Sequence, residues 1–338
     1  MKQVTDFSKY MAIFFTKHLP DRKGASPNTV KSYRDCFVLL FNYMESEHAV
    51  KPEKIYLKTI QRSHIEGFLD WLESSKGCTI STRNVRLAAI HSFYRFMQYE
   101  MPDRLEQWQE ILTIPQKKPK AGTMNYTSID GIKLLLEMPD KKSPQGLRDL
   151  ALLSLMYDSG ARVQEIADLK VSMVRLSSPS VVKLSGKGGK TRIVPMMKEQ
   201  ISLLELYMKK SGLLRPEKQE HYLFTNRQGT KLTRAGIGYI LQKYVLEAHK
   251  KEPLLIPEKF SCHCLRHSKA MHMLQAGVNL VYIRDFLGHT SIQTTEIYAR
   301  ADSKQKRDAI EKAYSEVLPA EESVWENNKD VLDWLKQL

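Results

Sequence analysis

The chain has 338 residues, of which 42% are hydrophobic, so it can bury ordinary globular cores and is not a disordered protein. A chain of this length favours two domains over a single core. The formal net charge of +14 predicts a polyanionic partner, although charge alone does not separate DNA from RNA or an acidic membrane.

No stretch approaches the roughly 18 continuous apolar residues that a membrane span requires. Residues 1–6 (MKQVTD) lead directly into an amphipathic pattern, without the apolar core of a signal peptide. We therefore expect an intracellular protein.

The four cysteines are Cys36, Cys78, Cys262 and Cys264, and their scatter gives no disulfide framework. Cys262 and Cys264 flank His263, which raises the possibility of a metal site. However, no second Cys/His pair recurs at a finger-like distance, and neither CxxC nor HExxH occurs. We expect free, mostly buried thiols and no bound metal.

The first third of the chain contains four amphipathic segments. They cover residues 7–18, 26–43, 63–73 and 79–97. Each has apolar residues at helical spacing, and Ser26-Pro27-Asn28 is a typical helix start. The pattern predicts a small helical bundle over residues 1–114.

Positive side chains lie near the starts of two of these helices: Lys31, Arg34, Arg83 and Arg86. Such charges can form a solvated face, or they can follow a phosphate backbone, since helix N-termini and basic groups both favour anions. The residues alone do not decide between these two interpretations.

Residues 115–126 predict a basic linker, because prolines, lysines and Gly122 occur there without apolar periodicity. Thr127 and Asp130 resemble a capping box that opens a second domain, residues 127–338. A basic tether between two basic domains would let them close around a duplex.

The second domain is again predicted to be mainly helical. Helices are expected at residues 150–157, 199–209, 233–248, 265–276, 281–287 and 292–300, the first of them stopped by Gly160. Residues 181–185 and 191–195 are two short β-branched runs around a glycine-rich turn, which predicts a hairpin. The fold class is therefore mainly α with a small antiparallel β-sheet.

The hairpin turn, Gly186-Lys187-Gly188-Gly189-Lys190-Thr191, mimics a nucleotide-binding loop. Walker spacing requires a glycine where Leu184 stands, and the following residues are strand-like rather than helical. We reject ATP binding on these grounds.

Six polar residues carry the chemical signal in chain order: Arg162, Lys187, His263, Arg266, His289 and Tyr298. Two arginines suit a fork-shaped grip on one phosphate. Two histidines and a lysine can share protons, and a tyrosine can attack phosphorus. Each residue also has a plain structural interpretation, namely an Arg162–Glu165 ion pair, a turn lysine, a helix-capping histidine or a core tyrosine.

The motifs around these residues resemble those of the tyrosine recombinases of the phage-integrase family, in particular its Xer-like branch. They are Gly160-Ala161-Arg162, the Gly186–Lys190 turn, His263-Cys264-Leu265-Arg266, Leu287-Gly288-His289 and Thr295-Glu296-Ile297-Tyr298. The resemblance covers nearly the whole chain. It implies a four-helix, SAM-like core-binding domain followed by a catalytic domain.

The resemblance also implies residue roles. Tyr298 would attack a scissile phosphodiester to form a 3′-phosphotyrosyl link, while Arg162 and Arg266 stabilise the charge on the phosphate. Lys187 would protonate the departing 5′ oxygen. His263 would take or share the tyrosine proton, His289 would donate to the phosphate, and Glu165 would orient this cluster. No cofactor is implied.

The resemblance further implies double-stranded DNA with inverted-repeat core sites as partner, strand exchange through a Holliday junction, and a nucleoid-associated bacterial protein. Candidate DNA contacts are Arg192, Thr233 and Arg234, beside the four basic residues of the first domain. A C-terminal helix at about 321–338, with Val331, Trp334, Leu335 and Leu338 as its apolar stripe, would link a homotetramer. A topoisomerase and a regulator that has lost catalysis are the alternatives, and the six intact residues weigh against the second.

Overall fold

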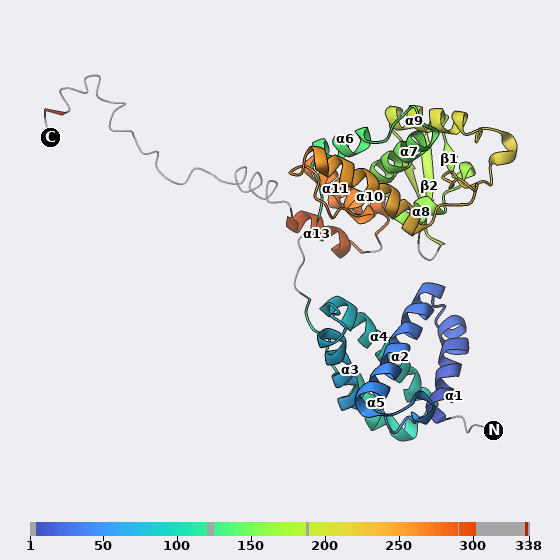
Figure 1. Ribbon diagram of the computed structural model, residues 1–338, viewed down its shortest axis with the longest axis vertical. Coiled ribbons are helices and arrows are strands. Elements are labelled where there is room, and N and C mark those ends of the chain that lie inside the picture. Colours follow the sequence, from blue (N-terminus) through green and yellow to red (C-terminus); the bar gives the residue numbers. More distant parts are fainter. Residues whose placement is uncertain (1–4, 120–124, 187–188, 290, 302–334, 337–338) are drawn as a thin grey trace. The chain divides into compact units, whose positions relative to one another are not determined.

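The computed structural model describes residues 5–119, 125–186, 189–289, 291–301 and 335–336, without the side chains of residues 299–301. The chain divides into two compact units, Met1–Gly122 and Thr123–Leu338 (Figure 1). The predicted fold class is confirmed, because both units are mainly helical and the second contains a small antiparallel sheet.

The first unit is a bundle of amphipathic helices. They are α1 (Asp6–Ile13), which continues as the π-helical segment Phe14–Arg22, α2 (Pro27–His48), α3 (Arg62–Ser74), α4 (Ile80–Glu100) and α5 (Leu105–Leu112). Ser26 and Thr79 cap α2 and α4 by accepting from the amides of Thr29 and Thr82. The core is rich in phenylalanine, and the ring of Phe93 lies within 5.5 Å of those of Phe7, Phe14 and Phe37.

Helix α5 was not predicted from the sequence. It has eight residues, and only Trp108 and Ile111 are buried, so its apolar pattern is too short to be seen beside Pro102. Its tryptophan nevertheless fills the bundle and donates from Nε1 to the carbonyl of Met101 at 2.9 Å.

The start of the predicted linker lies against the first unit. Nζ of Lys117 is 2.6 Å from Oε1 of Glu73 on α3, and its backbone amide and carbonyl both bond to the side chain of Asn84 on α4. At least up to this residue, the segment is fixed by polar contacts rather than being a free tether.

The second unit packs its helices around one core and a small sheet. The helices are α6 (Ile129–Glu137), α7 (Pro144–Ser159), α8 (Val163–Ala167), α9 (Lys198–Lys210), α10 (Arg234–Lys251), α11 (Cys262–Gln275), α12 (Leu280–Leu287) and α13 (Gln293–Ala301). The almost wholly buried helix α7 packs against α9 and α11, which places it at the centre of the unit.

The sheet has the order β1-β2-β3, with β1 (Val174–Arg175), β2 (Val181–Ser185) and β3 (Thr191–Pro195) all antiparallel. The predicted hairpin is β2–β3, and β1 adds a two-residue strand at its edge. Leu184 pairs with Arg192 and Val182 with Val194, so these four side chains share the inner face.

Helix α6 begins one residue later than the predicted capping box. Ser128 is its N-cap and accepts from the amide of Gly131 at 3.2 Å. The capping role predicted for Thr127 is wrong, because its hydroxyl donates to the carbonyl of Leu255 and its amide donates to Oγ of Ser268 at 3.0 Å. Thr127 thus anchors the start of the second unit to α11.

The C-terminal helix predicted at about 321–338 lies outside the described residues, apart from Leu335 and Lys336. None of the helices in the described segments combines the length and hydropathy needed to cross a bilayer.

Candidate active site

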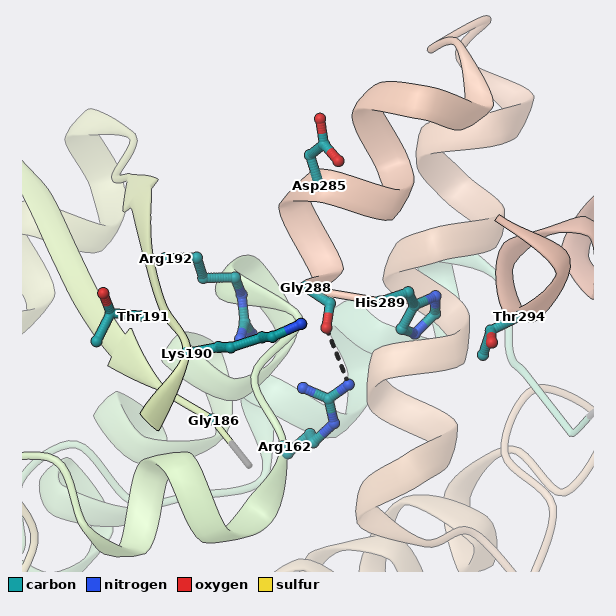
Figure 2. A pocket seen from close by; sticks show the side chains of 9 residues that line it. All are labelled: Arg162, Gly186, Lys190, Thr191, Arg192, Asp285, Gly288, His289 and Thr294. Atoms are coloured by element: carbon teal, nitrogen blue, oxygen red, sulfur yellow. Dashed lines mark hydrogen bonds between the residues drawn. The ribbon is translucent and has the colours of Figure 1, made fainter. Parts of the chain in front are cut away.

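A cavity of about 420 Å³ opens on the second unit where the β2–β3 hairpin faces the end of α12 (Figure 2). Its lining is mostly polar and basic, with Asp285 as the one acidic member. The lining residues are Arg162, Gly186, Lys190, Thr191, Arg192, Asp285, Gly288, His289 and Thr294.

Arg162 stands at the junction between α7 and α8. Gly160 ends α7 with a φ of +56°, and a Cβ there would lie 2.8 Å from Cδ2 of Leu287, so the close approach of α12 requires glycine. Arg162 then caps α8, and its Nη2 donates to the carbonyl of Gly288 at 3.2 Å. Its side chain remains 37% exposed, which leaves part of the guanidinium for an anion.

Glu165 is the buried carboxylate that organises this wall. It accepts from the amide of Arg162 at 2.8 Å, from Nη1 of Arg162 at 3.0 Å, and from Nη1 and Nη2 of Arg192 at 2.8 and 2.9 Å. Burial alone would raise the pKa of Glu165, but the hydrogen bonds and charges of Arg192 and Arg162 outweigh it and lower the pKa. The group is therefore ionised and orients both guanidiniums.

The proposed DNA contact through Arg192 is not supported by its position. Strand alternation turns this residue inward, where its side chain is only 12% exposed, and both terminal nitrogens bond to Glu165. Its Nε donates to the carbonyl of Phe286 at 2.8 Å, which ties β3 to α12. Arg192 acts here as a clamp between these elements rather than as an exposed cation.

Arg266 is almost fully buried on α11, with 4% exposure. Its Nη1 donates to the carbonyl of Gly160 at 2.6 Å and its Nη2 to that of Leu287 at 2.8 Å, so it joins the C-terminal ends of α7 and α12. Burial and the charges of Arg162 and Arg192 lower the pKa of Arg266 to about 10. It still carries its proton at neutral pH.

Tyr298 on α13 is 1% exposed and packs among apolar side chains of α11 and α12. Its hydroxyl lies 3.0 Å from Nδ1 of His267, the residue directly after Arg266. Burial raises the pKa of Tyr298 above its ordinary value of 10.0, and the charges of Arg266 and Arg162 oppose that rise. The two guanidiniums therefore act on this phenol electrostatically.

His263 does not occupy the position expected for a partner of Tyr298. It is exposed at the first turn of α11, and its ring centroid lies 6.2 Å from that of His267. Sequence reasoning missed His267, because HxxR spacing points to the residue three before the arginine. Only the packing of α13 on α11 reveals which histidine meets the tyrosine.

His289 follows α12 and lies between the cavity and the tyrosine. Its Nδ1 is 2.9 Å from Oγ1 of Thr295, and its ring is parallel to that of Tyr298, with centroids 6.4 Å apart. Burial and the charges of Arg266, Arg162 and Arg192, together with His267, lower the pKa of His289 to about 4. His289 is therefore neutral at pH 7 and can donate one hydrogen bond without adding charge.

Lys187 lies outside the described residues, so its predicted role stays a prediction. Lys190, in the same turn, lines the cavity and points its amine into it (Figure 2). Sequence analysis noted Lys190 only as part of the turn, because nothing in the spacing ranks one hairpin lysine above the other.

Four of the other candidate DNA contacts are exposed, namely Lys31, Arg34, Thr233 and Arg234. Lys31 and Arg34 are exposed on α2, although Arg34 pairs with Asp35 at 2.8 Å, and Arg234 is exposed at the start of α10. Thr233 caps α10 by accepting from the amide of Gly236.

The last two candidate contacts, Arg83 and Arg86 on α4, are less exposed than expected. Arg83 is 5% exposed and lies 2.9 Å from Oε1 of Glu73, so its position does not support a surface phosphate contact. Arg86, which is partly buried, donates to the carbonyl of Ser32 at 2.8 Å. Both face neighbouring helices because α4 is the central, most buried helix of its bundle.

Within the part of the chain that the structure describes, no three His, Cys, Asp or Glu residues are grouped as a metal site would need. The cysteines beside His263 form no disulfide, and burial raises the pKa of Cys262 to about 11. The Cys262 thiol is therefore not a reactive thiolate at neutral pH.

Two family descriptions match this chain. Residues 126–305 match the description "Phage integrase family", and residues 13–100 match "Phage integrase, N-terminal SAM-like domain". The first match contains the cavity, Arg162, Arg266 and Tyr298, and the second contains most of the first unit.

Relatives of similar length support these matches. The y4rC protein of Sinorhizobium fredii, named as an integrase/recombinase, is 34% identical over 88% of this chain and 89% of its own. The tyrosine recombinase XerC of Myxococcus xanthus is 31% identical over 89% of this chain and 96% of its own. The crystal structure of the XerH site-specific recombinase bound to a palindromic difH substrate has the same fold, with a TM-score of 0.69 at 21% identity over 85% of this chain and 80% of that one.

Proposed function

This chain belongs to the phage integrase family of tyrosine recombinases, and we propose that Tyr298 is the nucleophile with which it breaks DNA strands. The protein is an enzyme of site-specific recombination, and DNA is its substrate. One observation carries the assignment of Tyr298. Its buried hydroxyl lies against α11, 3.0 Å from Nδ1 of His267, the residue that directly follows the buried Arg266.

In the cleavage step that we propose, Oη of Tyr298 attacks a phosphodiester. A bond forms from Oη to phosphorus, the bond from phosphorus to the 5′ oxygen breaks, and a 3′-phosphotyrosyl link remains. The ester retains the energy of the broken bond, so a free 5′-hydroxyl from another strand can reverse the step. Two such exchanges pass through a four-way Holliday junction.

The arginines would supply most of the electrostatic stabilisation. Arg162 has exposed guanidinium surface toward the cavity, and Arg266 has donors beyond the two that bond to backbone carbonyls. We assign them the two non-bridging oxygens, whose charge grows in the transition state. Glu165 and Arg192 position Arg162 rather than touching the phosphate.

Two residues are proposed as the proton donors of the site. His289 is neutral and lines the cavity, so we assign it a hydrogen bond to a non-bridging oxygen. We assign protonation of the departing 5′ oxygen to Lys187 of the hairpin turn. The proton-sharing role predicted for His263 has no support among the described contacts of Tyr298.

We further propose a homotetramer that acts on inverted-repeat core sites in the bacterial cytoplasm. The first unit would bind the core site as a SAM-like domain, and exposed Lys31, Arg34 and Arg234 would meet phosphates. The biological setting is the integration or transposition of a mobile element, or the Xer-like resolution of replicon dimers.

Removal of the sequence after Pro319 is expected to prevent tetramer assembly on DNA while leaving the binding of one subunit to a half-site. The reason is the apolar stripe of Val331, Trp334, Leu335 and Leu338, which gives a terminal helix one face to bury against a neighbour. Sedimentation of the shortened and full-length chains on the same duplex measures this. A four-subunit complex formed by the shortened chain would contradict the proposed helix exchange.

A strand-exchange assay tests recombination against the topoisomerase alternative. Two duplexes of different length carry the sequence that the protein selects from a random pool, and only one of them is labelled. Recombination transfers the label to a product of new length. Relaxation of a supercoiled plasmid without any such product would favour a topoisomerase and contradict the proposal.

A further inference from the structure

The hydroxyl of Tyr298 contacts a side chain, His267, that has no role in the cleavage step proposed above. Nδ1 of His267 lies 3.0 Å from it, and the two rings are tilted by 57° with centroids 5.7 Å apart. The contact joins α11 to α13. Because Tyr298 is 1% exposed, this imidazole, and not bulk water, is beside the phenolic proton.

The groups around His267 keep its ring neutral. From α11 it faces His263 and Arg266, and from the segments after α12 it faces Tyr298 and His289. Burial, followed by the charges of His263 and Arg266, lowers the pKa of His267 below its ordinary value of 6.5. A neutral imidazole that is protonated on Nε2 presents a lone pair on Nδ1 to the phenol.

A second histidine of α11, His272, contacts Tyr157 of α7 and serves as a comparison, because this contact is purely structural. Nδ1 of His272 lies 2.9 Å from the hydroxyl of Tyr157, and its Nε2 bonds to the carbonyl of Thr127 at 2.9 Å. Both ring nitrogens are thus fixed. Among the described residues, Nε2 of His267 has no hydrogen-bond partner, so its ring can change protonation state without breaking a second bond.

We propose that His267 is the general base of strand cleavage, and that its Nδ1 removes the phenolic proton of Tyr298 as the Oη–phosphorus bond forms. The inference deepens the proposed function and rests on it. As the bond from phosphorus to the 5′ oxygen breaks, that oxygen takes its proton from the hairpin lysine. In rejoining, the attacking 5′-hydroxyl gives its proton back to the lysine, and the imidazolium of His267 returns its proton to the departing phenolate, so every proton is accounted for.

The test uses the full chain and a nicked duplex built on the sequence that Tyr298→Phe protein selects from a random pool. In single turnovers, His267→Ala is expected to slow covalent complex formation by about 10²–10⁴-fold, the usual range for loss of a general base. DNA binding is expected to stay unchanged. Added imidazole is expected to restore part of the lost rate, because it can fill the space left by the side chain.

His272→Ala is the matched control, since it removes a histidine with the same kind of tyrosine contact from the same helix. It is expected to lower thermal stability without any rescue of the rate by imidazole. His267→Asn keeps a polar side chain of similar reach and covers the case in which His267→Ala does not fold. Wild-type rates in a folded His267→Asn or His267→Ala protein would overturn the inference, as would a slow variant that imidazole does not accelerate.

The pH profile and a modified substrate separate a base from a merely structural histidine. The wild-type rate is expected to fall only as the pH drops through the lowered pKa of His267, because only the neutral ring accepts a proton. Without the base, the rate is expected to rise with pH toward the raised pKa of Tyr298. A 5′-bridging phosphorothiolate, whose sulfur leaves without a proton, is expected to rescue a lysine variant and not His267→Asn.

The outcomes distinguish this inference from the function on which it rests. If Tyr298→Phe still forms the covalent complex, the proposed nucleophile is wrong. If Tyr298→Phe loses the complex while folded His267 variants keep wild-type rates and profiles, the nucleophile stands and the base is wrong.

Discussion

Replacement of Tyr298 by phenylalanine is expected to abolish the covalent protein–DNA complex and to leave DNA binding intact. The substitution removes the one oxygen that becomes esterified, so no slower version of the same reaction remains. The phenyl ring still fills its place among Met271, Leu274 and Leu287. Only the hydrogen bond to His267 is lost, which limits the loss of folding free energy to about 0.5–1.5 kcal/mol.

The measurement is a denaturing gel of the protein with a nicked duplex, next to a gel-shift titration of the same samples. Tyr157→Phe is the matched control, because it also removes a tyrosine hydroxyl that contacts a histidine of α11, but outside the proposed site. It is expected to retain the covalent band. A band that persists in Tyr298→Phe would exclude this residue as the nucleophile.

Replacement of Arg266 by alanine is expected to have the second largest effect, a loss of more than about 10²–10³-fold in the rate of cleavage, as for removal of one oxyanion donor. The substitution removes a buried positive charge next to both the phosphate position and Tyr298. It also leaves the carbonyls of Gly160 and Leu287 without their donor. We expect the free energy of unfolding to fall by about 1–3 kcal/mol for each carbonyl left buried and unpaired.

Arg266→Lys separates charge from geometry. A lysine keeps the positive charge, but it cannot direct two donors to the ends of α7 and α12 and a third to a phosphate in one plane. It is therefore expected to recover some stability and little rate. Single-turnover cleavage and thermal melting of the same preparations measure the two effects.

Arg148→Ala is the control for a partly buried, hydrogen-bonded arginine outside the site. Arg148 pairs with Asp149 at 2.7 Å and donates to the carbonyl of Thr225 at 3.0 Å. Its loss is expected to lower stability and to leave the cleavage rate of the folded protein unchanged. If Arg266→Ala cleaved at the wild-type rate when folded, the electrostatic role proposed for this guanidinium would be contradicted.

The main features of the fold were predictable because they depend on local patterns. Helical periodicity located most of the long helices, and the glycine-rich turn between β-branched runs located the hairpin β2–β3. Helix α5 and strand β1 were not predicted. They have eight and two residues, respectively, and such short segments contain too little periodicity. Thr127 was misread as a cap, since a threonine side chain bonds equally well to a distant carbonyl.

The residues that support the site were harder to predict than the motif residues themselves. Arg162, Arg266, His289 and Tyr298 stand in recognisable motifs, and contacts with the ends of α7 and α12 bring them together. The clamp formed by Arg192 depends on strand register, and the contact of His267 depends on how α13 packs on α11. Neither contact can be predicted from the spacing of residues in the sequence.

Charge patterns were the least specific guide. Arg83 was grouped with three other basic residues as a possible phosphate contact, yet it pairs with Glu73 in the interior of the first unit. A positive side chain near a helix start favours an anion, and a carboxylate of a neighbouring helix satisfies that preference as well as a phosphate does. The sequence alone does not show whether a carboxylate of the protein or a phosphate of a ligand will lie next to such a side chain.

Peptide mass spectrometry of the trapped complex tests the central claim most directly. The wild-type chain is allowed to cleave a nicked duplex, the DNA is digested with nucleases, and the protein is cut into peptides. We predict a nucleotide adduct on the peptide that contains Tyr298, attached through a 3′ phosphate to the phenolic oxygen. An adduct on any other residue, or one attached through a 5′ phosphate, would contradict the account.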